Sequence, residues 1–141
     1  MRISTRGRYA LRMMLDMALA DSGNRAGKRD LPSDRRFQRN IWSRYVHSEQ
    51  GWICTECPWP QGGYFLTRKP EEYTVGMILR LTEGSLSPVD CLDEGAESCP
   101  RQESCVTFIL WKQLDDAIRG VVDKVTLQDL VDWSQVQGQD Y

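Results

Sequence analysis

The chain lacks any apolar segment long enough to cross a bilayer, and it contains a single histidine, His47. A membrane-spanning helix needs about 20 consecutive apolar residues, and no run in this sequence approaches that length. The N-terminus carries arginines but no clean apolar stretch that ends in a small-residue cleavage site. These absences argue against a membrane protein, and we expect the chain in the cytoplasm.

Catalytic motifs are absent as well. The sequence has no paired nucleophile and base, no phosphate-binding loop and no HExxH or similar metal-protease motif. Its 141 residues match the usual size of one domain, and its 40% hydrophobic and 27% charged residues are typical of globular proteins. We therefore expect a small globular protein that is not an enzyme.

The charge of the chain is unevenly distributed, although the net charge is only -2. Residues 1–45 contain eleven lysines and arginines against four aspartates, whereas the C-terminal part is acidic. A basic end on a nearly neutral chain is the electrostatic pattern of a DNA-binding module joined to another unit. A solvated basic face is the alternative, and charge alone does not separate the two.

The five cysteines are Cys54, Cys57, Cys91, Cys99 and Cys105. Their odd number and the absence of an export signal favour metal or redox chemistry over a disulfide framework. The last three lie in an acidic loop, and thiolates on one loop can converge on an iron–sulfur cluster. The Cys54-x-x-Cys57 pair has no second CxxC to complete a zinc site, so we discount it.

Apolar spacing predicts four helices and one short strand. Steps of three and four residues predict a helix over 5–20, and Gly62-Gly63 before Tyr64 predicts a turn that leads into a strand. Thr74 is expected to cap a helix that runs through Leu81 and ends at Gly84. Residues 85–104 form a loop in this prediction, and residues 24–60 show no clear period.

The longest predicted helix runs from Val106 to Val125. A small domain has little surface to cover its apolar stripe, so burial against a second copy is the expected arrangement, with packing inside the chain as the alternative. Thr126 and Asp129 resemble a capping box that starts a short last helix. The stripe consists of Leu110, Leu114, Ile118, Val121 and Val125, with Trp111 and Val122 beside it.

Three stretches resemble the IscR/CymR/NsrR family of dimeric winged-helix regulators. They are MRISTRGRYALRMMLDMAL, QGGYFLTRKPEEYTVGMILRLTEG and VDC…C…CVTFILWKQLDDAI. The order and spacing of all three agree with the family, and the resemblance covers residues 1–23 and 61–131. It implies a mainly α fold with a small β wing, in which a winged helix-turn-helix domain precedes a long dimerisation helix.

The resemblance also implies a domain organisation and a function. Residues 1–84 would form the DNA-binding domain (25–60 being atypical), 85–105 the cysteine loop, 106–125 the dimerisation helix, and 126–141 a last helix and tail. The chain would be a homodimeric transcription regulator that binds a double-stranded DNA operator and senses iron–sulfur cluster or cysteine/redox status. Arg6 and Arg8 would contact phosphates, and the wing would consist of Gln61, Gly62, Gly63 and Tyr64.

By the same resemblance, Cys91, Cys99 and Cys105 would hold a [2Fe–2S] cluster. Their spacing, with seven and then five intervening residues, resembles but does not equal that of the family's cluster loop. Phe108 stands where cluster-binding relatives can carry a histidine ligand, so the fourth ligand is unassigned. Two alternatives stay open: redox-reactive thiols without metal, and a metal- or cluster-binding protein without DNA activity that also uses Cys54 and Cys57.

Residues 25–60 depart from the family, which places its recognition helix there. Codons for residues 36–45 can be chosen so that a reading two bases out of phase encodes EISEKYLEQI. Codons for residues 48–60 can likewise encode LNRAGFVRSVRG when read one base out of phase. Both strings resemble the family at the expected places, so we interpret this stretch as a frameshifted reading. We predict that the chain as written binds its operator weakly or not at all.

Overall fold

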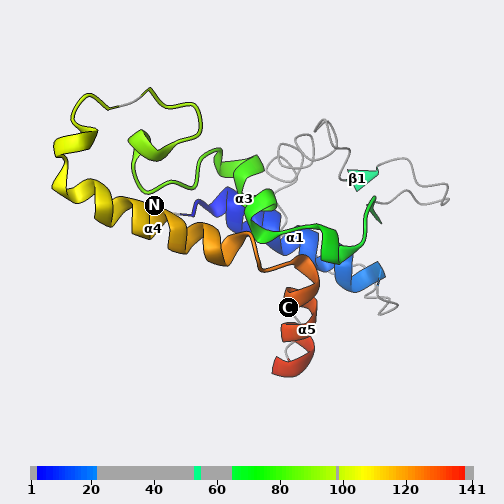
Figure 1. Ribbon diagram of the computed structural model, residues 1–141. Coiled ribbons are helices and arrows are strands. Elements are labelled where there is room, and N and C mark those ends of the chain that lie inside the picture. The colour runs from blue at the N-terminus through cyan, green and yellow to red at the C-terminus, as the bar shows by residue number, and fades with distance from the viewer. Residues whose placement is uncertain (1–2, 22–52, 55–64, 98, 139–141) are drawn as a thin grey trace.

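A computed structural model describes residues 3–21, 53–54, 65–97 and 99–138, and the structural statements below concern those residues (Figure 1). Four helices dominate: α1 (Thr5–Asp21), α3 (Val75–Glu83), α4 (Val106–Val122) and α5 (Leu127–Gln137). Two short strands, β1 (Ile53–Cys54) and β2 (Phe65–Leu66), pair with each other, and three 3-10 turns, η1 (Pro70–Glu72), η2 (Asp90–Leu92) and η3 (Gln102–Ser104), lie between the helices.

The core forms where α1 packs against α3 and α5 (Figure 1). The helix predicted over 5–20 is confirmed, and its apolar face is buried: Ala10, Met14 and Ala18 are at most 1% exposed. Ile78 of α3 and Val131 of α5 are fully buried in the same cluster. Burial of each large side chain of this kind contributes about 1.5–3 kcal/mol, so the methionine-rich face of α1 serves packing.

Local capping signals place both ends of α3 where the sequence predicts them. The Thr74 hydroxyl accepts a hydrogen bond from the Met77 N–H at 3.1 Å, which satisfies one of the unpaired amides of the first turn. At the other end, Gly84 adopts φ 80°, a conformation that glycine takes without a steric cost. The helix therefore spans Val75–Glu83 and stops at the expected glycine.

The predicted β wing is not seen in the described residues beyond one short ladder. Ile53 pairs with Leu66 and Cys54 with Phe65, in antiparallel register. The strand expected after Tyr64 is thus present at β2, which packs on α1. The four residues predicted to form the wing, Gln61–Tyr64, lie outside the described part of the chain.

The long helix α4 begins at Val106 as expected but ends at Val122, before the predicted Val125. The chain leaves the helix because residues 125–127 pair with the segment that enters α3. The Val125 carbonyl accepts a hydrogen bond from the Val75 N–H at 2.9 Å, and the Leu127 N–H donates to the Tyr73 carbonyl at 2.8 Å. This pairing ties the end of α4 to the start of α3.

The predicted capping box at the start of α5 is confirmed. The Thr126 hydroxyl accepts a hydrogen bond from the Asp129 N–H at 3.2 Å, and the Asp129 carboxylate accepts one from the Thr126 N–H at 2.8 Å. The hydrogen bonds from Thr126 lower the pKa of the Asp129 carboxyl. Within the part of the chain that is described, no helix combines the length and the apolarity that a membrane span requires.

Candidate functional site

The first turn of α1 presents two exposed arginines on a fixed backbone. Arg6 and Arg8 are exposed, whereas Gly7 between them is buried. The Glu83 carboxylate of α3 accepts hydrogen bonds from the Ser4 N–H at 3.2 Å and from the Ser4 hydroxyl at 2.6 Å. A Cβ on Gly7 would collide with that carboxylate, so glycine permits the close approach. The predicted phosphate-contacting residues therefore point outward from a turn that is anchored to α3.

Two further basic side chains, Arg68 and Lys69, are exposed directly after β2. Their backbone is fixed, because the Arg68 N–H donates to the hydroxyl of the buried Tyr73 at 3.1 Å and the Lys69 N–H donates to the Glu72 carboxylate at 2.9 Å. The sequence reasoning did not single them out. Their position immediately after the predicted wing strand was the available signal.

The three cysteines predicted to bind a cluster occupy different parts of the loop before α4. Cys91 is exposed in η2, Cys99 is half-buried before η3, and Cys105 is half-buried at the N-cap of α4. Among the described residues, no group of three His, Cys, Asp or Glu side chains could hold a metal ion. The described arrangement therefore does not assemble the predicted three-thiol site. Cys57 and His47 lie outside the described residues.

Cys105 is the cysteine whose environment favours the thiolate form. Its sulfur and the Thr107 hydroxyl lie 3.4 Å apart within hydrogen-bonding geometry. This contact, together with the backbone N–H groups of Phe108 and Thr107, lowers the pKa of the Cys105 thiol. Because the thiolate is the nucleophile and the metal ligand, Cys105 is suited to alkylation, oxidation and metal binding.

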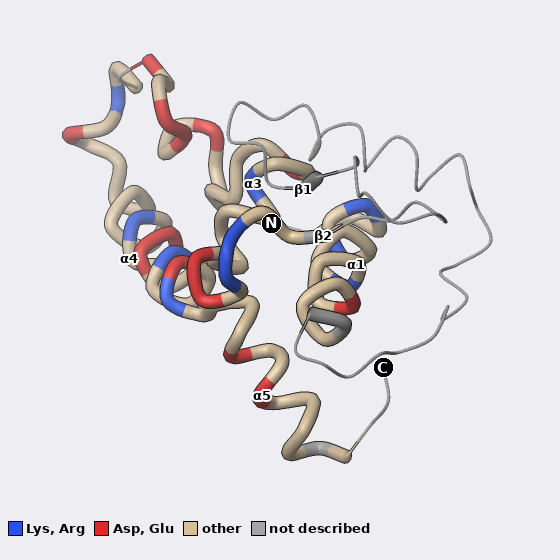
Figure 2. Tube along the Cα trace, turned by 90° about the vertical axis from the view of Figure 1, so that its right-hand side faces the viewer, with Lys and Arg blue, Asp and Glu red and all other residues tan. Residues whose placement is uncertain are grey.

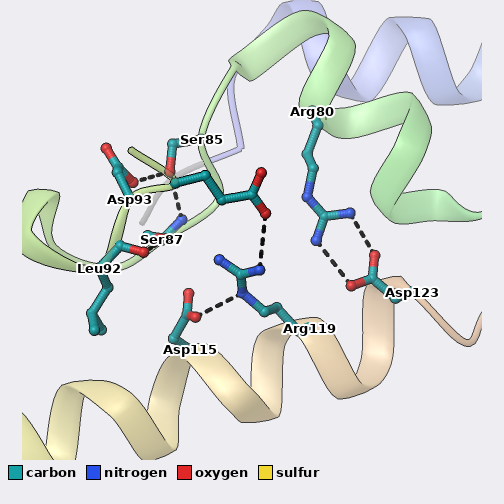
Figure 3. Close-up of polar contacts among 9 residues, drawn as sticks. Arg80, Ser85, Ser87, Leu92, Asp93, Asp115, Arg119 and Asp123 are labelled. Carbon is teal, nitrogen blue, oxygen red and sulfur yellow. Dashed lines mark hydrogen bonds and ion pairs between the residues drawn. The ribbon is translucent and has the colours of Figure 1, made fainter. Parts of the chain in front are cut away.

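Hydrogen bonds within the start of the cysteine loop hold this segment together, and one ion pair joins it to α4 (Figure 3). The Ser85 hydroxyl donates to the Asp93 carboxylate, and the Ser87 hydroxyl donates to the Leu92 carbonyl at 3.2 Å. Arg119 of α4 reaches the loop through an ion pair with Glu94 at 3.2 Å. Cys91 thus lies in a segment whose neighbours are bonded to each other and to α4.

A second ion pair joins α4 to α3. Arg80 donates two hydrogen bonds to the Asp123 carboxylate, at 2.5 and 2.9 Å (Figure 3). The hydrogen bond from Arg80 lowers the pKa of the Asp123 carboxyl. The end of α4 is therefore fixed to α3, the helix that packs on α1, and α4 connects the cysteine loop to this helical core.

The outer face of α4 is apolar and uncovered in the single chain. Val106 is 86% exposed, Leu110 55% and Val121 62%. Only part of the predicted apolar stripe is exposed. Ile118 and Val122 are half-buried against the chain itself, whereas the exposed members are Leu110, Leu114 and Val121. Acidic residues lie along α4 and along the loop before it (Figure 2). Exposed apolar side chains in a contiguous row mark an interaction surface.

Comparison with protein families matches residues 3–133 to the model of Rrf2, described as an iron-dependent transcriptional regulator. The chain belongs to the Rrf2 family. The HTH-type transcriptional regulator IscR of Pectobacterium atrosepticum is 32% identical over 145 residues, which cover 96% of this chain and 82% of that protein. IscR of Escherichia coli is 30% identical and covers 96% of this chain.

Solved structures of the Rrf2 family agree with this fold. CymR (YrzC), the global cysteine regulator of B. subtilis, superposes with a TM-score of 0.64 at 28% identity, covering 94% of this chain and 98% of that one. The fold also matches IscR of T. potens, with a TM-score of 0.65 at 23% identity and coverage of 100% and 93%. The chain is thus a transcriptional regulator with the fold of these winged-helix proteins.

The effect of Thr107 on the pKa of the Cys105 thiol can be tested directly by substitution. Replacement Thr107→Val removes the hydroxyl that lowers the pKa of the thiol, so this pKa should rise and less thiolate should be present near neutral pH. We expect alkylation of Cys105 to slow several-fold at pH 7 and to approach the original rate at high pH, where both thiols are ionised. The rate against pH, followed by mass spectrometry, measures this shift. Equal profiles for the two chains would contradict it.

Proposed function

We propose that this Rrf2-family regulator acts as a homodimer that binds a double-stranded DNA operator and senses iron–sulfur cluster or cysteine/redox status through its cysteine loop. The observation that carries the proposal is the attachment of this loop to α4. Glu94 pairs with Arg119, and α4 is joined to α3 through Asp123 and Arg80. A chemical change at the loop therefore acts on the helix that connects it to the DNA-binding core.

The homodimer is supported by the uncovered face of α4. Exposed apolar side chains lie on the outward side of this helix, and a symmetric partner can bury the same surface on both copies. Two copies would present two basic first turns, as a pseudo-palindromic operator requires. The resemblance of the sequence to dimeric regulators implies the same arrangement.

DNA contact is assigned to the basic residues at the start of α1 and to the wing. Arg6 and Arg8 would bind phosphates, and the residues Gln61–Tyr64 would approach the minor groove. We add Arg68 and Lys69, whose fixed backbone after β2 keeps their side chains outside the core. Such contacts position the protein on the duplex without reading its sequence.

Sensing is assigned to Cys91, Cys99 and Cys105. Three thiols would supply three of the four ligands of a [2Fe–2S] cluster, which when bound gives a regulator an iron- and oxygen-sensitive group. The described residues do not gather the thiols at one point. We therefore propose that this chain senses the state of its loop thiols, which can be metal-bound or free and reduced or oxidised.

Anaerobic purification followed by absorption spectroscopy and metal analysis tests the sensor. We expect iron with visible absorption from a cluster, or, if the thiols act without metal, a colourless protein whose loop cysteines react with oxidants. Cys99→Ala should abolish the bound iron and its visible absorption, because it removes one of the three thiol ligands. Cys54→Ala is the matched control and should change neither. Loss of metal from the Cys54 variant would favour a metal protein without DNA activity.

A further inference from the structure

A pocket of about 270 Å³ lies between the end of α3, the start of the cysteine loop and α4 (Figure 3). It is slightly smaller than the range of about 300–1,000 Å³ typical of sites for drug-sized ligands, so any occupant would be small. Most of the residues that line it are polar or charged, and Leu86 is the one large apolar side chain among them, although apolar atoms make up about as much of the wall as polar atoms. The charged residues that line it are Arg80, Asp93, Glu94, Asp115 and Arg119.

Arg119 lines this pocket, and one nitrogen of its guanidinium group is available to donate hydrogen bonds to an occupant. Its Nε donates to the Asp115 carboxylate at 2.7 Å, and one terminal nitrogen donates to Glu94 at 3.2 Å. Its second terminal nitrogen has no partner among the residues that the structure describes. Asp115 is only 7% exposed, so this guanidinium is held in place from a buried carboxylate.

The loop side of the pocket supplies acceptors. The Ser85 hydroxyl donates to one Asp93 oxygen, and the other oxygen has no partner within the described part of the chain. The Glu94 side chain is 81% exposed, and one of its oxygens pairs with Arg119, while the other has no partner among the described residues and is open to an occupant. Because Asp123 already neutralises Arg80, the remaining positive charge of the pocket is that of Arg119, and it faces the carboxylates of Asp93, Glu94 and Asp115.

We propose that this pocket binds a small free α-amino acid. The ammonium group would lie against Asp93 and Glu94, and the carboxylate would accept a hydrogen bond from the second terminal nitrogen of Arg119. A simple anion would meet three carboxylates, and a simple amine would leave the guanidinium nitrogen unused. In the described residues the acidic side chains do not converge as a metal ion needs. A zwitterion satisfies both kinds of group.

Such a ligand would bridge two elements of the regulator. Asp93 and Glu94 belong to the segment that follows Cys91, whereas Arg119 belongs to α4. Occupancy would therefore hold the cysteine loop against α4. The proposal goes beyond the sensing of thiol status, and it depends on neither a cluster nor DNA binding.

The test uses the full chain, with thermal unfolding and calorimetric titration of each standard L-α-amino acid. We expect at least one to bind and to raise the unfolding temperature, while methylamine and acetate, alone or together, do not. Asp93→Asn and Arg119→Lys should each weaken binding at least about tenfold, since each removes a charge-assisted hydrogen bond. Asp132→Asn on α5, whose carboxylate accepts only from Gln128, is the matched control and should leave affinity unchanged.

Three results would overturn the proposal: no amino acid binds, methylamine binds as tightly as the best amino acid, or Asp93→Asn binds as well as the original chain. Arg119→Lys also loses the contact with buried Asp115, so its folding is checked by circular dichroism. If it fails to fold, Asp93→Asn and Glu94→Gln decide, because both lie in the loop outside the core.

Discussion

A chain in which EISEKYLEQI replaces residues 36–45 and LNRAGFVRSVRG replaces residues 48–59 is expected to bind DNA specifically, at least about 100-fold more tightly than the original chain. The reason is that operator recognition requires a helix in the major groove. The first replacement string is rich in the strong helix formers Glu, Lys, Leu and Gln, and the second removes Pro58 from its segment. Specific binding by such proteins typically exceeds non-specific binding by about 10³–10⁷.

The measurement is fluorescence anisotropy with a duplex selected from a random pool by the repaired chain. A chain that carries EISEKYLEQI in shuffled order is the matched control, because it keeps composition and charge but not the helical pattern. It should bind only at the weak, salt-sensitive level of non-specific contacts. Tight, sequence-specific binding by the original chain would refute the predicted loss of operator binding. Codons that are incompatible with the two offsets would refute the frameshift interpretation.

The elements that the sequence predicted correctly are those whose limits depend on neighbouring residues. Thr74 and Gly84 lie at the two ends of α3, and Thr126 reaches Asp129 within the first turn of α5. Capping acts over three or four residues, so its signals can be read from a short stretch. The apolar period of α1 is likewise local, and the buried residues of the helix follow it.

The features that the sequence did not reveal depend on residues far apart in the chain. The end of α4 is determined by the backbone hydrogen bond between Val75 and Val125, which no local sequence pattern predicts. Arg80 and Asp123 are 43 positions apart, and Arg80 also lines the pocket. Alternating charge along a helix gives no sign of which distant carboxylate each arginine will meet. The pocket could therefore not be predicted from the sequence.

Leu110→Glu is expected to convert the proposed dimer into monomers by placing a charge on the apolar face of α4. In the single chain this side chain is 55% exposed, so the substitution should leave the fold intact. Full burial of a leucine contributes about 1.5–3 kcal/mol, and about half of the Leu110 side chain is left to bury, so the two copies together contribute about 1.5–3 kcal/mol per dimer. The dissociation constant should rise by about 10–10²-fold, before any added cost of burying the glutamate.

Sedimentation velocity over a range of concentrations measures this change, with circular dichroism to show that the helices persist. Lys112→Glu provides the control, because Lys112 is exposed on the same helix but lies outside the apolar stripe. It introduces the same carboxylate and should leave the dimer unchanged. A Leu110 variant that sediments as the original dimer would mean that this face of α4 is not the interface. An original chain that stays monomeric at high micromolar concentration would mean that no such dimer forms.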